Sequence, residues 1–279
     1  MKQYRVREGD VTAVDTKTQL TTVGSDAAPG PLMVPQGATH IIGLIIASIQ
    51  NMAAATGFSS FIRLEGPGMV NGPESIVSGA GGNAVATGGN FVNKAVQIPV
   101  NFPVSAGNEI QIFAEMAGTD VGGLGFVVGL IFSDAAGSGA DSHKSLTVEG
   151  DLGTVDARAA LTTQGSLATP VLIVPAGYTK IDKIIVAASS EGLADGKQGW
   201  YIRLGGNAVK GGEQIIPVSA SGRIAVQAGS DAAPQCITPI VFEDVQIEVS
   251  PSDNISIWGE GAGDDTGTGH MAVTLLFAK

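Results

Sequence analysis

The sequence repeats itself once, and this internal repeat limits the folds that the chain can adopt. The motif Phe61-Ile62-Arg63-Leu64 returns as Tyr201-Ile202-Arg203-Leu204. Other stretches that recur in the same order are Glu8-Gly9-Asp10 with Glu149-Gly150-Asp151, Leu20-Thr21-Thr22 with Leu161-Thr162-Thr163, and Ile110–Glu115 with Ile255–Glu260. The spacing changes only between the matched stretches, where loops tolerate insertions. The sequence therefore predicts a tandem duplication of one domain.

Within each copy, apolar and polar residues alternate with a period of two, which is the pattern of half-buried β-strands. The 40 Gly and 13 Pro residues favour short strands joined by tight turns. In the first copy we expect strands at about 11–23, 31–35, 40–50, 58–64, 74–78, 92–102, 109–116 and 125–132. In the second copy we expect them at about 153–164, 171–174, 180–188, 199–204, 213–218, 237–248, 254–259 and 270–278. Only Met52–Thr56 and Ile224–Ala228 are compatible with a helical turn.

About eight strands in each copy indicate a two-sheet sandwich or a barrel, and their spacing favours a jelly roll. An immunoglobulin sandwich is disfavoured because Cys236 is the single cysteine, so the Cys…Trp…Cys pattern is absent. We therefore predict an all-β protein of two tandem, duplicated eight-stranded β-sandwich (jelly-roll) domains. The first spans residues 1–133 and the second residues 145–279, and the small and polar residues of 134–144 form a linker.

The charge of the chain narrows the classes of partner. Lys and Arg number 15 against 26 acidic residues, which gives a formal net charge of −11. An extensive nucleic-acid-binding face is therefore disfavoured, and so is binding to an anionic lipid surface. The first residues lack the apolar run of a secretion signal, and the longest apolar runs, such as Ile41–Ile49, are too short to cross a bilayer as a helix.

Two acidic residues at equivalent places in the repeat are the first candidates for a site. Glu115 and Glu260 each follow an aromatic residue by two positions. A pair of carboxylates serves glycosidases only when both flank one bond, and equivalent positions of separate domains rarely converge in that way. We instead expect structural ion pairs, Arg63 with Glu115 and Arg203 with Glu260, in which each Glu satisfies an Arg charge half-buried between sheet and loop.

The other candidates for chemistry lack the spacing that their chemistry needs. The acidic turn Gly259–Asp265 does not match a calcium loop, and His40, His143 and His270 are too scattered for a transition-metal site. The stretch Gly192–Lys197 is one residue short of a phosphate loop. We expect no catalytic residue, no metal and no cofactor. The residues Lys2, Arg5 and Arg7 form a basic N-terminal arm that we expect to pair with acidic groups or solvent.

Two jelly rolls in one chain of this length resemble the double jelly-roll major capsid proteins of tailless viruses. The resemblance covers the whole chain through its repeat and its predicted strands, and it carries no family motif. It implies a homotrimer with a pseudo-hexagonal outline, because three two-domain chains present six similar faces that can tile a shell.

The sequence thus predicts a virion structural protein, most simply a major capsid subunit of an icosahedral shell, and not an enzyme. Its expected partners are its own copies, other virion proteins, and an internal membrane or protein layer, with synthesis in the host cytoplasm. A head-decoration, spike or tail protein is the first alternative. A carbohydrate-binding sandwich is the second, with Trp200, Tyr201 and Trp258 as its aromatic residues.

Overall fold

The computed structural model describes residues 2–51, 57–82, 90–118, 123–137, 141–153, 156–166, 170–191, 197–222, 235–237, 239–263 and 268–279. Every helix or strand within these ranges is a β-strand. The first half contains β1 (Gln3–Val11), β2 (Thr18–Gln19), β3 (His40–Asn51), β4 (Gly57–Glu65), β5 (Glu74–Gly82), β6 (Asn90–Pro103), β7 (Gln111–Gly118) and β8 (Gly123–Ser133). The second half contains β9 (Lys144–Leu152), β10 (Ala157–Ala160), β11 (Lys180–Glu191), β12 (Lys197–Gly205), β13 (Gln214–Gly222), β14 (Gln235–Ile237), β15 (Ile240–Phe242), β16 (Ile247–Glu248), β17 (Ser256–Gly263) and β18 (Thr268–Ala278).

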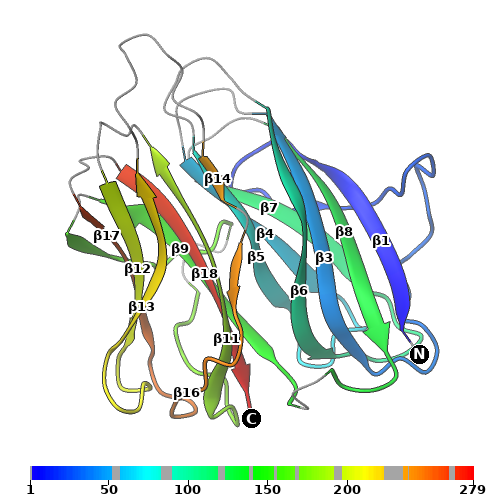
Figure 1. The fold of residues 1–279 in the computed structure, drawn as a ribbon. Helices are drawn as coiled ribbons and strands as arrows, with labels where there is room; N and C mark the ends of the chain where they lie inside the picture. Colours follow the sequence, from blue (N-terminus) through cyan, green and yellow to red (C-terminus); the bar gives the residue numbers. More distant parts are fainter. Residues whose placement is uncertain are drawn as a thin grey trace.

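The first half folds into two antiparallel sheets with a core between them (Figure 1). One sheet has the strand order β1-β8-β3-β6, and we call it sheet A. The other, sheet B, has the order β5-β4-β7-β2, with β14 added beside β5. Successive strands thus pass from one sheet to the other at every connection except that between β4 and β5, which are neighbours in sheet B, and this is the winding of a jelly roll.

The second half has the same strand order. Its sheet C runs β15-β11-β18-β9, with β16 also paired to β11, and its sheet D runs β13-β12-β17-β10. Sheet C therefore matches sheet A strand for strand, and sheet D matches sheet B. The predicted fold class is confirmed as all-β with jelly-roll sandwiches, and the repeat of strand order parallels the repeat in the sequence.

The repeated Arg motif lies on the strand that the alternation predicts. In β4, Ile62 and Leu64 are fully buried in the core of the first sandwich, while Arg63 points to the opposite face of sheet B. The strand β12 places Ile202 and Leu204 in the second core in the same way. A register shift beside Phe61 recurs beside Tyr201, so the two strands share even their irregularity.

The sequence prediction was wrong about the first strand of each sandwich. A single strand at 11–23 was expected, but the structure has β1 before it and only the short β2 within it. The basic N-terminal arm is therefore part of an edge strand. Arg7 lies on the same face of β1 as the core residue Val11, and its guanidinium donates to the carbonyl oxygens of Pro29 and Gly30. In the second half, β9 likewise precedes β10, so the strand begins at the end of the predicted linker.

Three other predicted strands differ from the structure. The stretches 31–35 and 171–174 make only isolated bridges, Met33 with Glu109 and Ile173 with Asn254. The predicted strand 237–248 is broken into pieces, and its neighbour β14 pairs with β5 of the first sandwich. Asp244 and Gln246 have positive φ, which interrupts the extended backbone between β15 and β16. Both helical turns expected at Met52–Thr56 and Ile224–Ala228 lie outside the described residues.

The two sandwiches pack against each other through the outer faces of sheets C and B (Figure 1). The apolar part of this interface consists of four buried residues of sheet C that join the core of the first sandwich: Ile185, Ala187, Ala272 and Leu276. Ser75 and Val77 lie on the edge strand β5, where backbone N–H groups need partners. Those N–H groups donate to Ser145 Oγ and Thr274 Oγ1, both at 2.9 Å. The second sandwich therefore protects an edge of the first.

Candidate functional site

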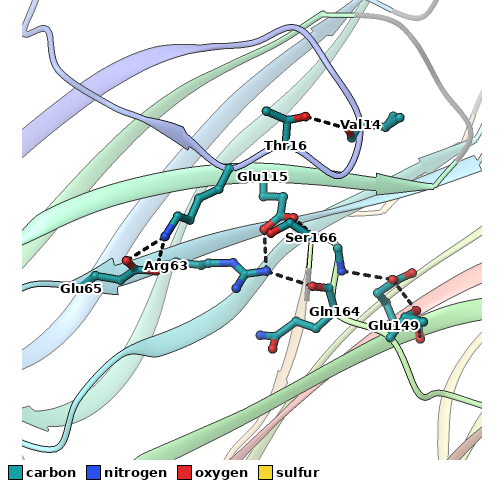
Figure 2. A network of polar contacts seen from close by, with 11 residues as sticks. Val14, Thr16, Arg63, Glu65, Glu115, Glu149, Gln164 and Ser166 are labelled. Carbon is teal, nitrogen blue, oxygen red and sulfur yellow. Dashed lines mark hydrogen bonds and ion pairs between the residues drawn. The ribbon is translucent and has the colours of Figure 1, made fainter. Parts of the chain in front are cut away.

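A network of polar groups crosses the interface between the two sandwiches, and it begins at the first Arg motif (Figure 2). Arg63 Nη2 lies 2.5 Å from Glu115 Oε2 on the neighbouring strand β7. The same nitrogen donates to the carbonyl oxygen of Gln164 at 2.9 Å, in the loop that follows β10. The backbone N–H of Ser166 in that loop donates to Glu115. One loop of the second sandwich is thus held by an ion pair of the first.

The glycine between these loop residues explains the close fit. Gly165 has a φ of +50°, a conformation that side chains other than Gly rarely adopt. A Cβ at Gly165 would collide with the carboxylate of Glu115. The N–H of Gly165 donates to Glu149 Oε1 at 3.3 Å, which links the loop to β9. Backbone and side chains together therefore fix this loop against sheet B.

The far end of the network is a buried histidine. His270 Nε2 lies 2.8 Å from Glu149 Oε2, and its Nδ1 lies 2.8 Å from Asp151 Oδ1. Burial opposes the charge of this ring, but hydrogen bonds to Asp151 and Glu149 outweigh burial and raise the pKa of His270 to about 9. At neutral pH the ring is therefore an imidazolium held between two carboxylates. The hydrogen bond from His270 in turn lowers the pKa of Asp151.

Ser59 completes an arrangement that superficially matches a Ser-His-Asp catalytic triad. Its Oγ lies 3.0 Å from His270 Nε2, and His270 Nδ1 faces Asp151. A nucleophilic serine needs a neutral imidazole that can accept its proton, whereas this imidazole is charged and its Nε2 also faces Glu149. Ser59 is 0% exposed, so a substrate has no access to its hydroxyl. The cluster consists of ion pairs within sheet C, and the hydrogen bond between Ser59 and His270 links it to the first sandwich.

The structure brings together both pairs of residues that the sequence singles out. Arg63 and Glu115 are nearly inaccessible, with side-chain exposures of 6% and 0%. Arg203 Nε contacts Glu260, and Arg203 Nη1 also lies 3.0 Å from Glu213 Oε1. Hydrogen bonding to Glu260 raises the pKa of Arg203 further. This second pair keeps exposures of 17% and 14%, because in the part of the chain that the structure describes no sandwich covers the outer face of sheet D.

The two ion pairs occupy separate sandwiches, so Glu115 and Glu260 do not form one carboxylate pair. No family model matches the sequence, and no curated protein matches it either. Solved structures that are similar over almost the whole chain include two viruses and a glycanase. Broad bean stain virus matches with a TM-score of 0.34 and 8% identity, over 100% of this chain and 88% of that one.

The structure of Sulfolobus turreted icosahedral virus matches with a TM-score of 0.26 and 9% identity, over 99% of this chain and 57% of the other. Recombinant peptide:N-glycanase F matches with a TM-score of 0.37 and 8% identity, over 99% and 96% of the two chains. The expected likeness to jelly-roll virus structures is thus found as a likeness of overall fold. The TM-scores are low for the viruses and for the glycanase alike, so they support no inference about function.

The remaining sequence candidates do not converge. Among the described residues, no group of three or more His, Cys, Asp or Glu side chains is placed to hold a metal ion, and no helix there is long and apolar enough to cross a membrane. The acidic residues Asp264 and Asp265 and the stretch Gly192–Gly196 lie outside the described residues. His143 bonds Asp182 at 3.0 Å beside the linker, and burial lowers the pKa of His143.

Sequence reasoning missed the role of His270 and Glu149. Glu149 belongs to a recognised repeat motif, but that motif pairs it with Glu8, which gives no hint of a buried partner. His270 has Gly125 as its counterpart, since His270 pairs with Asp151 and Gly125 pairs with Asp10. The available signal was that both copies contain the same two acidic residues, whereas only the second copy contains a histidine opposite them.

Proposed function

We propose that this chain is a structural subunit of a virion, a capsid protein that assembles with copies of itself, and not an enzyme. The observation that carries the proposal is how the two sandwiches dock. Sheet C covers the outer face of sheet B within the chain, while among the described residues no sheet covers the corresponding outer faces of sheets A and D. A unit with two such unmatched faces is suited to repeated association.

The finer form of the proposal is a homotrimer with a pseudo-hexagonal outline that tiles an icosahedral shell. Three chains would supply six jelly rolls of the same strand order. The formal charge of −11 supports contacts with other virion proteins, or with a lining layer or membrane, more than with bulk nucleic acid. The place of such a subunit is the virion, after synthesis in the host cytoplasm.

The cluster of Ser59, His270 and Asp151 supports the proposal that the chain is not an enzyme. A nucleophile that is fully buried beside an imidazolium is fit for interface stability and unfit for turnover. Carbohydrate binding receives no comparable support, because Trp200 is 1% exposed and packs in the second core, and Tyr201 and Trp258 are only partly exposed.

Size-exclusion chromatography with light scattering tests the proposal directly. We expect a trimer or larger assembly at micromolar concentration, and electron micrographs that show rings or shells. Discrete trimers that never form shells would favour a decoration or spike role. A monomer at every concentration would overturn the proposal.

A further inference from the structure

The uncovered faces of sheets A and D are counterparts of the two faces that already dock within the chain. Strand register fixes the correspondence, because Ile45 pairs with Gly129 in sheet A just as Ile185 pairs with Thr274 in sheet C. The face of sheet A that corresponds to the buried face of sheet C contains Val6, Glu8, Ile45, Ala47, Val127 and Gly129, and it ends at Ile131, which is already buried within the chain. Two of these residues, Ile45 and Ala47, are identical to their docked counterparts Ile185 and Ala187.

The face of sheet D corresponds in the same way to the buried face of sheet B. On the two strands with the Arg motif and their neighbours, the residues of sheet D correspond to those of sheet B as follows: Tyr201 to Phe61, Arg203 to Arg63, Ile215 to Ser75, Pro217 to Val77 and Glu260 to Glu115. The aromatic residue, the arginine and the glutamate therefore recur in the same places. In sheet B the second sandwich covers these three residues. The corresponding face of sheet D is more open, and Ile215 on it is 52% exposed.

We propose that the outer face of sheet A in one copy docks on the outer face of sheet D in a second copy, in the arrangement that sheet C adopts on sheet B within the chain. This inference rests on the proposed function as an assembling subunit, and it names the surfaces and the partner. The contact is head-to-tail, since it joins two different faces, so each copy offers one of each.

The differences between the docked and free faces match one another. Within the chain, Val77 donates its N–H to Thr274 Oγ1. At the free faces Pro217 stands for Val77 and has no N–H, while Gly129 stands for Thr274 and has no hydroxyl. The donor and the acceptor are thus lost together, so burial of these two positions would leave neither an unpaired N–H nor an unpaired hydroxyl. Neighbouring positions on the free face of sheet A are apolar and exposed, with Val6 at 37% and Val127 at 44% exposure.

The loop contact also has a free counterpart. Gln164, Gly165 and Ser166 correspond to Val23, Gly24 and Ser25, because Thr22 and Thr163 bond Glu8 and Glu149 through the same pair of backbone hydrogen bonds. Gly24 has a φ of +54°, close to the +50° of Gly165.

A Cβ on Gly165 would strike Glu115, whereas a Cβ on Gly24 would meet nothing within 4 Å. The space that Glu115 fills within the chain is therefore empty at Gly24. In the docked pair, Glu260 of the second copy fills it and accepts from the N–H of Ser25, while Arg203 donates to the carbonyl oxygen of Val23.

Full-length variants test the two faces separately. Val127→Asp places a charge on the face of sheet A, and Ile215→Asp places one on the face of sheet D. We expect each to raise the dissociation constant for self-association at least about tenfold, since each replaces an apolar contact by a carboxylate that loses its hydration on docking. The matched control is Val171→Asp, at a 71% exposed valine outside both faces, which should assemble like the unchanged chain.

Mixing the variants tests the head-to-tail geometry. Each variant keeps the face that the other has lost, so a mixture should form two-chain complexes that stop at that size. If either single variant assembles like the unchanged chain, or if the mixture stays monomeric, the docking proposal is overturned while assembly by another surface still stands. An unchanged chain that is monomeric at every concentration would overturn both proposals.

Gly24→Asn tests the register of the docked faces. Asn tolerates positive φ, so the chain should keep its melting temperature. The added side chain enters the space assigned to Glu260 of the next copy, and self-association should weaken at least about tenfold. Assembly at unchanged affinity would show that this loop does not meet sheet D.

Discussion

At the scale of single residues, the charge of His270 is the property with the most direct consequence for stability. The ring is 2% exposed and its pKa is raised from 6.5 to about 9. A pKa raised in the folded state stabilises the fold fully below the unfolded value, and this contribution disappears as pH rises through the folded value. The stability of the interface should therefore decline between about pH 7 and pH 10.

The variant His270→Gln should remove that decline. It lacks a titrating ring, and it leaves Glu149 without its charged partner, so it should be less stable than the unchanged chain at pH 7 by roughly 2–4 kcal/mol. The difference should shrink towards pH 10. Urea unfolding across this pH range measures it, and His40→Gln, at a partly exposed histidine, is the matched control. A decline of equal size in the His270 variant would contradict the assignment.

The equivalent arginines allow a comparison of one ion pair in two environments. Arg63→Met leaves Glu115 buried without a positive partner, and we expect a loss of about 3–5 kcal/mol of unfolding free energy. Arg203→Met should cost the isolated chain far less, because Glu260 retains access to water. Chemical denaturation of both variants at low protein concentration makes the comparison. Equal losses would mean that burial does not separate the two pairs.

At the scale of strands, the edge of β5 shows how one sandwich completes the other. Glu74 at its start accepts from the N–H and the hydroxyl of Ser145, both at 2.7 Å, and lies 3.1 Å from Lys144 Nζ. Burial nevertheless raises the pKa of Glu74 from 4.5 to about 7. The folded chain therefore binds more protons than the unfolded chain in this range, and this residue makes stability fall as pH rises from about 4.5 to 7.

Glu74→Gln should flatten that part of the profile. The substitution is conservative for the fold, because Gln214 occupies the corresponding place on β13. Relative to the variant, the unchanged chain should lose stability between about pH 5 and pH 7.5, as its carboxylate ionises in a buried site. Thermal melts at intervals across this range give the readout. Parallel profiles for the two proteins would exclude Glu74 as the titrating group.

At the scale of the whole molecule, the sequence predicted the architecture well because its strongest signals are periodic. Two-residue alternation places Ile62 and Leu64 in the core, and the repeat predicts a second sandwich of the same kind. It failed for β1 and β9, where edge strands admit charged residues such as Arg7 on the face that carries the core residue Val11. It also failed for β14, because pairing with β5 of the other sandwich is a tertiary contact that no local pattern records.

The site was predictable only where it is internal to one copy of the repeat. The pairs Arg63–Glu115 and Arg203–Glu260 follow from neighbouring strands and their matching positions. The contacts of His270 with Ser59 and of Ser166 with Glu115 join the two sandwiches, and their geometry depends on how sheet C meets sheet B. The sequence shows which residues are present, but it does not show how sheet C is oriented on sheet B.

The net charge of the molecule makes a prediction about how its copies associate. Each copy has a formal charge of −11, so neighbouring copies repel one another, and the proposed docking faces are mainly apolar. Added salt screens this repulsion and leaves apolar burial intact. Self-association should therefore strengthen as salt rises and as pH falls from 8 towards about 5, where carboxylates begin to protonate. Light scattering across a salt series measures this directly.

An assembly bridged by nucleic acid would respond in the opposite direction, since salt weakens contacts with phosphate groups. Dissociation of the oligomers by added salt would therefore contradict assembly through these faces.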